Sequence, residues 1–122
     1  MRLLICGDRN WWDFKMIRNE LIKGVGEIEV VIEGEAKGAD RLAGIVADEL
    51  GIPVMKFPAQ WGLYGKAAGP IRNQQMLDEG KPDEVWVFHD SLSTSKGSKD
   101  MAERATKAGF RVKLFDHKRS QL

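Results

Sequence analysis

The stretch that most constrains the fold is residues 30–50, where a run of β-branched residues gives way to a glycine-containing loop and then to helical spacing. Residues 30–32 (VVI) have the composition of a strand that is buried on both faces. The apolar residues that follow share one face of a helix, at Leu42, Ile45, Val46 and Leu50. This stretch therefore predicts a strand, a short loop and a helix.

The loop of this unit, residues 34–40, is the first candidate binding element. Gly34 and Gly38 allow positive φ angles and a close approach of the backbone. Asp40 lies where the N-cap of the helix is expected, and a helix N-terminus offers its N–H groups and positive dipole end to an anion. We expect this loop to hold a phosphate. A plain strand-to-helix connection, which needs one glycine at most, is the alternative.

The same alternation runs along the whole chain. Strands are expected at residues 2–6, 29–33, 53–57, 84–88 and 111–115. Helices are expected at residues 13–23, 40–50, 70–80 and 98–108. Strands that alternate with helices in this way indicate an α/β protein with a mostly parallel sheet and right-handed crossovers.

Length and charge limit the class of protein. The 122 residues suit one domain, residues 1–116, followed by a polar C-terminal tail, residues 117–122. A net charge of +1 gives no overall field for nucleic acid or for an anionic membrane. Cys6 stands alone in an apolar run and is expected to be buried, which suits a reducing compartment. We find no membrane span or signal peptide and expect a cytoplasmic protein.

The sequence also disfavours several ligands. One cysteine and two distant histidines provide no metal-ligand spacing. The chain lacks GxxxxGK[ST], and residues 7–10 do not supply GxGxxG. ATP hydrolysis and classical NAD binding are therefore disfavoured, and we expect neither a metal nor a cofactor.

In a parallel sheet, the loops that follow the strands meet at one edge, where ligands bind. Here these loops are residues 7–11, 34–40, 58–69 and 89–97. The third is long for a compact α/β link and is expected to be functional. Ser95, Gly97 and Ser98 form a second helix start suited to phosphate. The alternative there is a solvated serine-rich loop with Ser98 as the N-cap.

Arg9 and Arg72 are the best cationic candidates, because a guanidinium donates two parallel hydrogen bonds to a phosphate. Salt bridges with nearby aspartates, Asp40 among them, are the alternative. Asn73, beside Arg72, is placed to hydrogen-bond a base or a ribose.

Aromatic side chains in the loops are suited to stacking on a base. Trp11, Trp61 and Tyr64 are the candidates, with packing inside the protein as the alternative for each. His89 follows the fourth strand, and we expect it to be hydrogen-bonded at the edge of the sheet rather than catalytic.

Five motifs, taken in order, resemble one family. They are Gly7-x-Arg9-x-Trp11, residues 34–40 (GEAKGAD), residues 57–61 (FPAQW), residues 65–76 (GKAAGPIRNQQM) and residues 95–98 (SKGS). This combination is similar to the YspA/YpsA-related group of the SLOG superfamily. The resemblance implies a three-layer Rossmann-like fold, with a five-stranded sheet in the order 3-2-1-4-5 and helices on both faces. It also implies binding of nucleotides or of nucleotide-derived signals such as ADP-ribose.

Two relatives in this superfamily suggest other functions. LOG enzymes cleave the N-glycosidic bond of nucleoside monophosphates; Arg72 matches their catalytic arginine and Asp100 one of their acidic pair, whereas Met101 replaces the other. DprA proteins bind single-stranded DNA with a similar glycine-containing loop and arginine-containing helix. LOG-type hydrolysis and DprA-like DNA binding are therefore kept as alternatives, and neither is favoured.

We predict a protein that binds a nucleotide or nucleotide-derived ligand, such as ADP-ribose or a nucleoside monophosphate, in a cleft at the strand ends. The expected ligand contacts are Gly7, Arg9, Gly34, Lys37, Gly38, Asp40, Trp61, Tyr64, Arg72, Asn73, Ser95, Gly97 and Ser98. Arg72 and Asp100 would be catalytic in the hydrolase alternative. Relatives often form homodimers, and Trp12, Trp86 and Phe110 fit a dimer interface or the core equally well.

Overall fold

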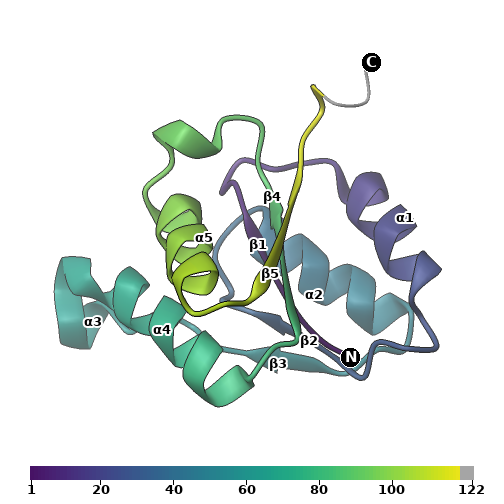
Figure 1. The fold of residues 1–122 in the computed structure, drawn as a ribbon, viewed down its shortest axis with the longest axis horizontal. Coiled ribbons are helices and arrows are strands. Elements are labelled where there is room, and N and C mark those ends of the chain that lie inside the picture. Colours follow the sequence, from purple (N-terminus) through teal and green to yellow (C-terminus); the bar gives the residue numbers. More distant parts are fainter. Residues whose placement is uncertain (119–122) are drawn as a thin grey trace.

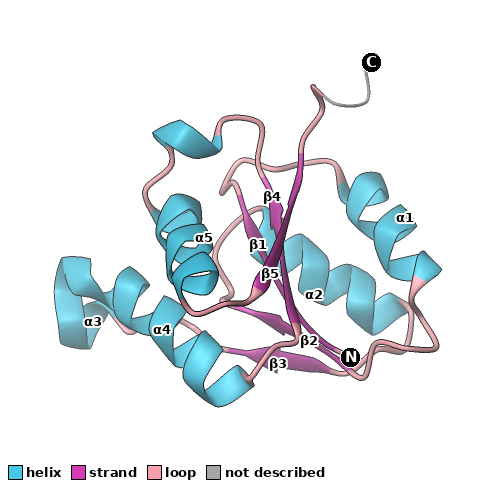
Figure 2. Ribbon diagram, viewed as in Figure 1, coloured by secondary structure: helices cyan, strands magenta, loops and turns pink. Residues whose placement is uncertain are grey.

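The computed structural model describes residues 1–118, in which strands and helices alternate. The strands are β1 (Arg2–Gly7), β2 (Val30–Glu33), β3 (Val54–Lys56), β4 (Glu84–Phe88) and β5 (Arg111–Phe115). The helices are α1 (Phe14–Lys23), α2 (Ala39–Glu49), α3 (Trp61–Tyr64), α4 (Ala68–Gly80) and α5 (Gly97–Lys107), with short 3-10 turns η1 (Gly65–Ala67) and η2 (Leu92–Thr94). Figure 2 shows the strands in the middle of the molecule with the helices around them.

Within the described residues, five parallel strands form one sheet in the order β3-β2-β1-β4-β5 (Figure 1). In the central strand β1, Leu4 lies opposite Ile32 of β2 on one side and Val85 of β4 on the other. The strand order reverses between β1 and β4, which is where doubly wound sheets bind ligands. The predicted α/β class, parallel sheet and strand order are confirmed.

Helices cover both faces of the sheet. α1 and α2 pack together on one face, and α4 and α5 pack together on the other (Figure 1). Alternate residues of β1 supply the two cores: Leu3 and Ile5 belong to the core under α1 and α2, and Leu4 and Cys6 to the core under α4 and α5. Burial raises the pKa of the Cys6 thiol, so this side chain packs as a neutral group.

The buried face of α2 is built mainly from small residues, and the predicted large ones are divided: Val46 is buried, and Leu42 and Leu50 are half-buried against the core. Ala43, Gly44 and Ala47 are buried, whereas Ile45, which we predicted on this face, is 56% exposed. A Cβ at residue 44 would lie 2.5 Å from Oε2 of Glu33. The small side chains therefore bring α2 close to the sheet and leave room for a buried carboxyl group beneath it.

The long connector between β3 and α4 contains structure that the sequence did not predict. Residues 61–64 form α3, and η1 follows directly. α4 then begins at Ala68, so that Pro70 lies in its first turn rather than at its start. α3 exposes large apolar side chains, Trp61, Leu63 and Tyr64.

The C-terminal segment after β5 is packed where it is described. We predicted a polar tail over residues 117–122; its first residue, His117, contacts Asp13 and Asp90 through its ring and its backbone. Residues 119–122 lie outside the described part of the chain. Across residues 1–118, no helix is both long enough and apolar enough to cross a membrane.

Candidate functional site

The loops after β1 and β2 meet directly at the carboxyl edge of the sheet. The N–H of Ala39, the first residue of α2, donates to the carbonyl oxygen of Asp8 at 3.1 Å. Gly38 has φ +88°, and a Cβ there would collide with the backbone of Asp8 and Arg9. Gly38 is therefore required for the contact between the two loops, whatever else the loops bind.

Asp40 does not cap α2 as predicted. The N-cap residue is Gly38, and Asp40 lies in the first turn of the helix, where its side chain is turned inward and is only 3% exposed. Its Oδ2 accepts the N–H of Gly34 at 3.0 Å, and the N–H groups of Gly7 and Ala36 also bond to the carboxylate. The physical reason is that the loop needs an internal acceptor for N–H groups that the sheet edge leaves unpaired.

Burial controls the charge state of Asp40. Removal from water raises the pKa of its carboxyl group to about 6, although the nearby Arg72 charge and the backbone N–H donors oppose the rise. Because Asp40 already accepts the N–H of Gly34, that amide has a partner inside the protein.

Arg72 connects α4 to the loop after β2. Its Nη1 donates to the carbonyl oxygen of Gly34 at 2.5 Å, and its Nε donates to Oδ1 of Asn73 at 3.1 Å. A Cβ at residue 34 would overlap the guanidinium and lie 2.9 Å from Oδ2 of Asp40. Gly34 therefore provides the space that Arg72 occupies. Its φ is not in the left-handed region, so a glycine is needed here for space and not for backbone conformation.

Asn73 extends this network to the start of α5. It is 4% exposed, and its Nδ2 donates to the carbonyl oxygen of Gly97 at 3.2 Å and to Oδ2 of Asp100 at 3.0 Å. The Nε of Arg104 donates to the same Asp100 oxygen at 2.8 Å. Arg72 and Asp100, the pair that the resemblance assigns to hydrolysis, are thus joined through the Asn73 side chain.

The start of α5 is not capped by Ser98, the alternative considered from the sequence. Lys96 occupies the N-cap position, and Ser98 is the second helical residue, largely buried. The N–H of Ser98 donates to Oγ of Ser95 at 3.1 Å. Ser98 as N-cap is therefore wrong, and Ser95 supplies the capping oxygen. Gly97 remains exposed.

A hollow of about 360 Å³ opens beside the contact between the first two loops. It is lined by Arg9, Asn10, Trp11, Trp12, Lys37, Gly38, Arg41 and Leu42. Cationic side chains from both loops and from α2 line this hollow. None of the described residues that line it carries a carboxylate. We name it the basic hollow.

Three predicted residues, Arg9, Lys37 and Gly38, meet in the basic hollow. Trp12 and Arg41 were missed. Trp12 is 73% exposed while its neighbour Trp11 is buried, and nothing in two adjacent tryptophans indicates which one faces solvent. Arg41 follows Asp40 in the first turn of α2, so its position at a predicted helix start was a usable signal.

Trp61 and Tyr64 lie elsewhere. Both belong to α3, which is at the far side of the molecule from α1 (Figure 1). Tyr64 lines a second hollow of about 580 Å³ beside α4, together with Arg104. The other predicted site residues line neither hollow: Gly7, Gly34, Asp40, Trp61, Arg72, Asn73, Ser95, Gly97, Ser98 and Asp100.

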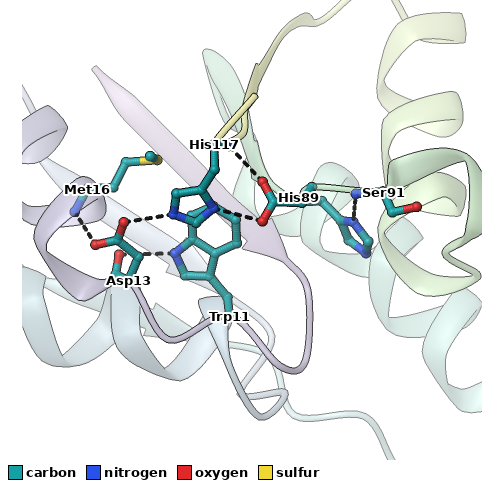
Figure 3. Close-up of polar contacts among 7 residues, drawn as sticks. Trp11, Asp13, Met16, His89, Ser91 and His117 are labelled. Atoms are coloured by element: carbon teal, nitrogen blue, oxygen red, sulfur yellow. Dashed lines mark hydrogen bonds and ion pairs between the residues drawn. The ribbon is translucent and has the colours of Figure 1, made fainter. Parts of the chain in front are cut away.

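Two histidines lie near the carboxyl ends of β4 and β5, as Figure 3 shows. His89 is buried, and its Nδ1 accepts the N–H of Ser91 at 2.9 Å, so it is hydrogen-bonded as predicted. His117 lies between two carboxylates: Nε2 is 2.8 Å from Oδ2 of Asp13, and Nδ1 is 2.7 Å from Oδ2 of Asp90. No sequence motif pointed to this second arrangement.

Solved structures and curated proteins resemble this chain over nearly its whole length. DNA processing protein A (DprA) from Streptococcus pneumoniae superposes with a TM-score of 0.73 at 21% identity, over 93% of this chain. The match covers 49% of the DprA chain, so this chain spans about half of that protein and shares its fold. The Gene 61 protein of Mycobacterium phage D29 is 32% identical over 126 residues, which is 96% of this chain and 98% of the phage protein.

A family model described as "YspA, cpYpsA-related SLOG family" matches residues 1–64. This segment contains β1 to α3 and both loops that form the basic hollow. The match covers more than half of the chain. The chain therefore belongs to the YspA, cpYpsA-related SLOG family.

Proposed function

We propose that this protein binds a nucleotide or nucleotide-derived ligand, such as ADP-ribose or a nucleoside monophosphate, in the basic hollow at the strand ends. The observation that carries the proposal is the placement of Arg9, Lys37 and Arg41 around one hollow whose described lining has no carboxylate. Such a set of cations attracts phosphate without a competing negative charge. A hollow of about 360 Å³ suits a small ligand.

We expect the base of the ligand to stack on Trp12. Its indole is 73% exposed, which is unusual for so large an apolar side chain and leaves a ring face open. Stacking of a base on an aromatic ring contributes about 1–3 kcal/mol. Trp11 is buried and forms the floor of the hollow rather than a free platform.

Side chains, more than backbone N–H groups, carry phosphate binding in this proposal. The N–H of Ala39 at the start of α2 donates to Asp8, and the N–H of Gly34 donates to Asp40. The positive end of the α2 dipole still faces the hollow through Gly38. Lys37 and Arg41 are therefore the residues whose removal tests the site most directly.

Isothermal titration calorimetry with AMP, ADP, ADP-ribose and NAD tests the proposal. Lys37→Ala and Arg41→Ala should each weaken binding about tenfold, because each removes a charged hydrogen-bond donor. Trp12→Ala should weaken the binding of nucleotides but leave the binding of inorganic phosphate unchanged. Lys107→Ala removes the same charge from the exposed last turn of α5 and is the matched control. Equal binding by the double variant Lys37→Ala/Arg41→Ala and by the control would refute the proposal.

Single-stranded DNA is a second candidate ligand, favoured by an exposed tryptophan beside several cations on an open surface. A strand that contacts Arg9, Lys37 and Arg41 should bind with a log–log salt slope of roughly −2. An oligothymidylate should then compete with ADP-ribose for the hollow. Oligonucleotide binding that survives Lys37→Ala/Arg41→Ala would place DNA on another surface.

Hydrolysis of nucleoside monophosphates is not favoured by the contacts of the two residues that would perform it. Asp100 already accepts from Asn73 and Arg104, and Arg72 donates to Gly34 and Asn73. A carboxylate held in this way is poorly placed to activate water. We expect no free adenine when the protein is incubated with AMP, and chromatography of the products measures it directly.

A further inference from the structure

His117 is the centre of a charged cluster with Asp13 and Asp90 (Figure 3). It does not line the basic hollow itself. Its ring nitrogens face Asp13, at the start of α1, and Asp90, in the loop after β4. Its backbone N–H donates to Oδ1 of Asp90 at 2.6 Å. The segment that follows β5 is thereby fastened to two loops of the strand-end edge.

The contacts of the His117 ring fit a ring in which both nitrogens carry protons. Each nitrogen lies 2.7–2.8 Å from a carboxylate oxygen, and an ionised carboxylate can only accept. A neutral ring would leave one nitrogen lone pair facing a carboxylate, so the contacts fit an imidazolium. Hydrogen bonds that the ring donates to Asp90 and then to Asp13 raise the pKa of His117 above its usual value.

Two tryptophan rings also favour the protonated form of the His117 imidazole. The Trp11 ring lies 4.7 Å from the imidazole, centroid to centroid, at an interplanar angle of 16°. The Trp12 ring lies 5.6 Å away at 8°. A cation stacked on indole rings is stabilised by the negative faces of their π systems. Both tryptophans also line the basic hollow, so His117 contacts its wall.

Asp13 links His117 to helix α1. Its Oδ1 accepts the N–H of Met16 at 3.2 Å and so caps the helix, while its Oδ2 holds His117. Its carbonyl oxygen accepts Nε1 of Trp11 at 3.0 Å. Residues 11–13, which orient both tryptophans, are thus held between the helix start and the imidazole.

We propose that His117 is a positioning residue for the basic hollow: as an imidazolium it holds Trp12 and residues 11–13 in the orientation that binds ligand, and loss of its proton weakens binding. This inference rests on the proposed function. Among residues 1–118, Asp13 and Asp90 are charged groups that face the ring, and Lys118, next along the chain, acts on Asp90. Because the folded pKa exceeds the unfolded value, the contact is complete below about pH 6.5 and is lost as pH rises through the folded pKa.

The protonation state can be measured without any ligand. The chain has two histidines, so the variant His89→Gln leaves one imidazole, whose ¹⁵N shifts follow the titration of His117. We expect the midpoint to lie above the ordinary value for histidine, and Asp90→Asn to lower it. A midpoint at or below the ordinary value for histidine, about 6.5, would overturn the inference.

Calorimetric titration with ADP-ribose at pH 6.5 and at pH 9 tests the coupling. The wild type should bind at least about fivefold more weakly at pH 9, and His117→Gln should bind weakly at both values. His117→Arg, which keeps a fixed positive charge between the two carboxylates, should retain binding and remove the pH dependence.

The outcomes separate the two proposals. Binding that responds neither to pH nor to His117→Gln would refute the positioning role and leave the proposed function intact. Absence of ADP-ribose and AMP binding at both pH values would refute the proposed function and the coupling with it. Thermal unfolding at pH 6.5 serves as the folding control for every variant.

Discussion

Nη1 of Arg72 lies 2.5 Å from the carbonyl oxygen of Gly34, and this contact joins α4 to the loop after β2. The same guanidinium lowers the pKa of the buried Asp40 carboxyl group, against the larger effect of burial. A side chain on residue 34 would occupy the space of the guanidinium. Gly34 and Arg72 are therefore one structural unit, and their substitutions should not be independent.

Gly34→Ala should destabilise the protein by about 1–3 kcal/mol, because the added methyl group displaces Arg72 and crowds Asp40. In an Arg72→Ala background the guanidinium is gone, so the same substitution should cost less. Urea denaturation of the two single variants and the double variant gives the interaction free energy, expected above about 0.5 kcal/mol. Additive free energies of unfolding would contradict the pairing.

Glu33→Gln should change how stability depends on pH. Glu33 is 2% exposed, and burial, together with the charges of Asp40 and Glu35, raises the pKa of its carboxyl group to about 7. The folded state therefore holds a proton that the unfolded state releases near pH 4.5, so stability falls as pH rises from about 4.5 to 7. The stability of the Glu33→Gln variant should not fall in this way. At pH 8 its free energy of unfolding should exceed that of the wild type by on the order of 1 kcal/mol.

Thermal unfolding between pH 4 and pH 8 measures the effect of Glu33→Gln. The glutamine keeps an oxygen that can accept the N–H of Glu35, so the loop contact survives. Glu29→Gln removes a carboxylate from an exposed position just before β2 and is the matched control. A parallel pH profile for Glu33→Gln and wild type would show that Glu33 is ionised in the folded protein.

The fold was largely predictable because each strand is a short apolar run with a turn signal at its end. The residues of β2 and β4 are all buried, and their polar members, Glu33 and Glu84, lie at strand ends, so the apolar run of each strand is unbroken. The buried face of α2 was harder, since close packing over Glu33 requires Gly44 and alanines and leaves Ile45 in solvent. Spacing of large apolar residues is therefore a poor guide where a helix lies unusually close to a sheet.

The site was predictable only in part, because sequence shows which residues share a loop but not which loops touch. Arg9 and Lys37 come together since Gly38 lets two loops meet. Trp61 lies apart from them because it belongs to a short helix inside a connector for which we predicted no helix. His117 contacts Asp13, 104 positions earlier in the chain, and no local pattern indicates a contact over that separation.

Glycine substitutions should separate steric overlap from backbone strain. Gly38→Ala adds a Cβ that collides with the loop after β1 and also forces φ +88° on a residue with a side chain. It should cost more than about 2 kcal/mol. Gly51→Ala has φ +76° but open space around it and should cost about 1 kcal/mol, while Gly26→Ala should be nearly neutral. Chemical denaturation of the three variants gives the order, and an equal cost at residues 38 and 51 would argue against the contact between loops.

Asn73 should matter for stability through its hydrogen bonds to α5. Asn73→Ala removes the donor to Gly97 and Asp100 and the acceptor for Arg72, at a cost of about 1–3 kcal/mol. Asn73→Asp keeps an acceptor but places a second carboxylate against Asp100, so its cost should be larger at pH 7 and should shrink as pH falls and the pair takes up a proton. Gln75→Glu adds the same charge two residues along α4 and should stay within about 0.5 kcal/mol of wild type. If Asn73→Asp were no worse than Asn73→Ala at pH 7, the Asp100 carboxylate would have to point away from residue 73.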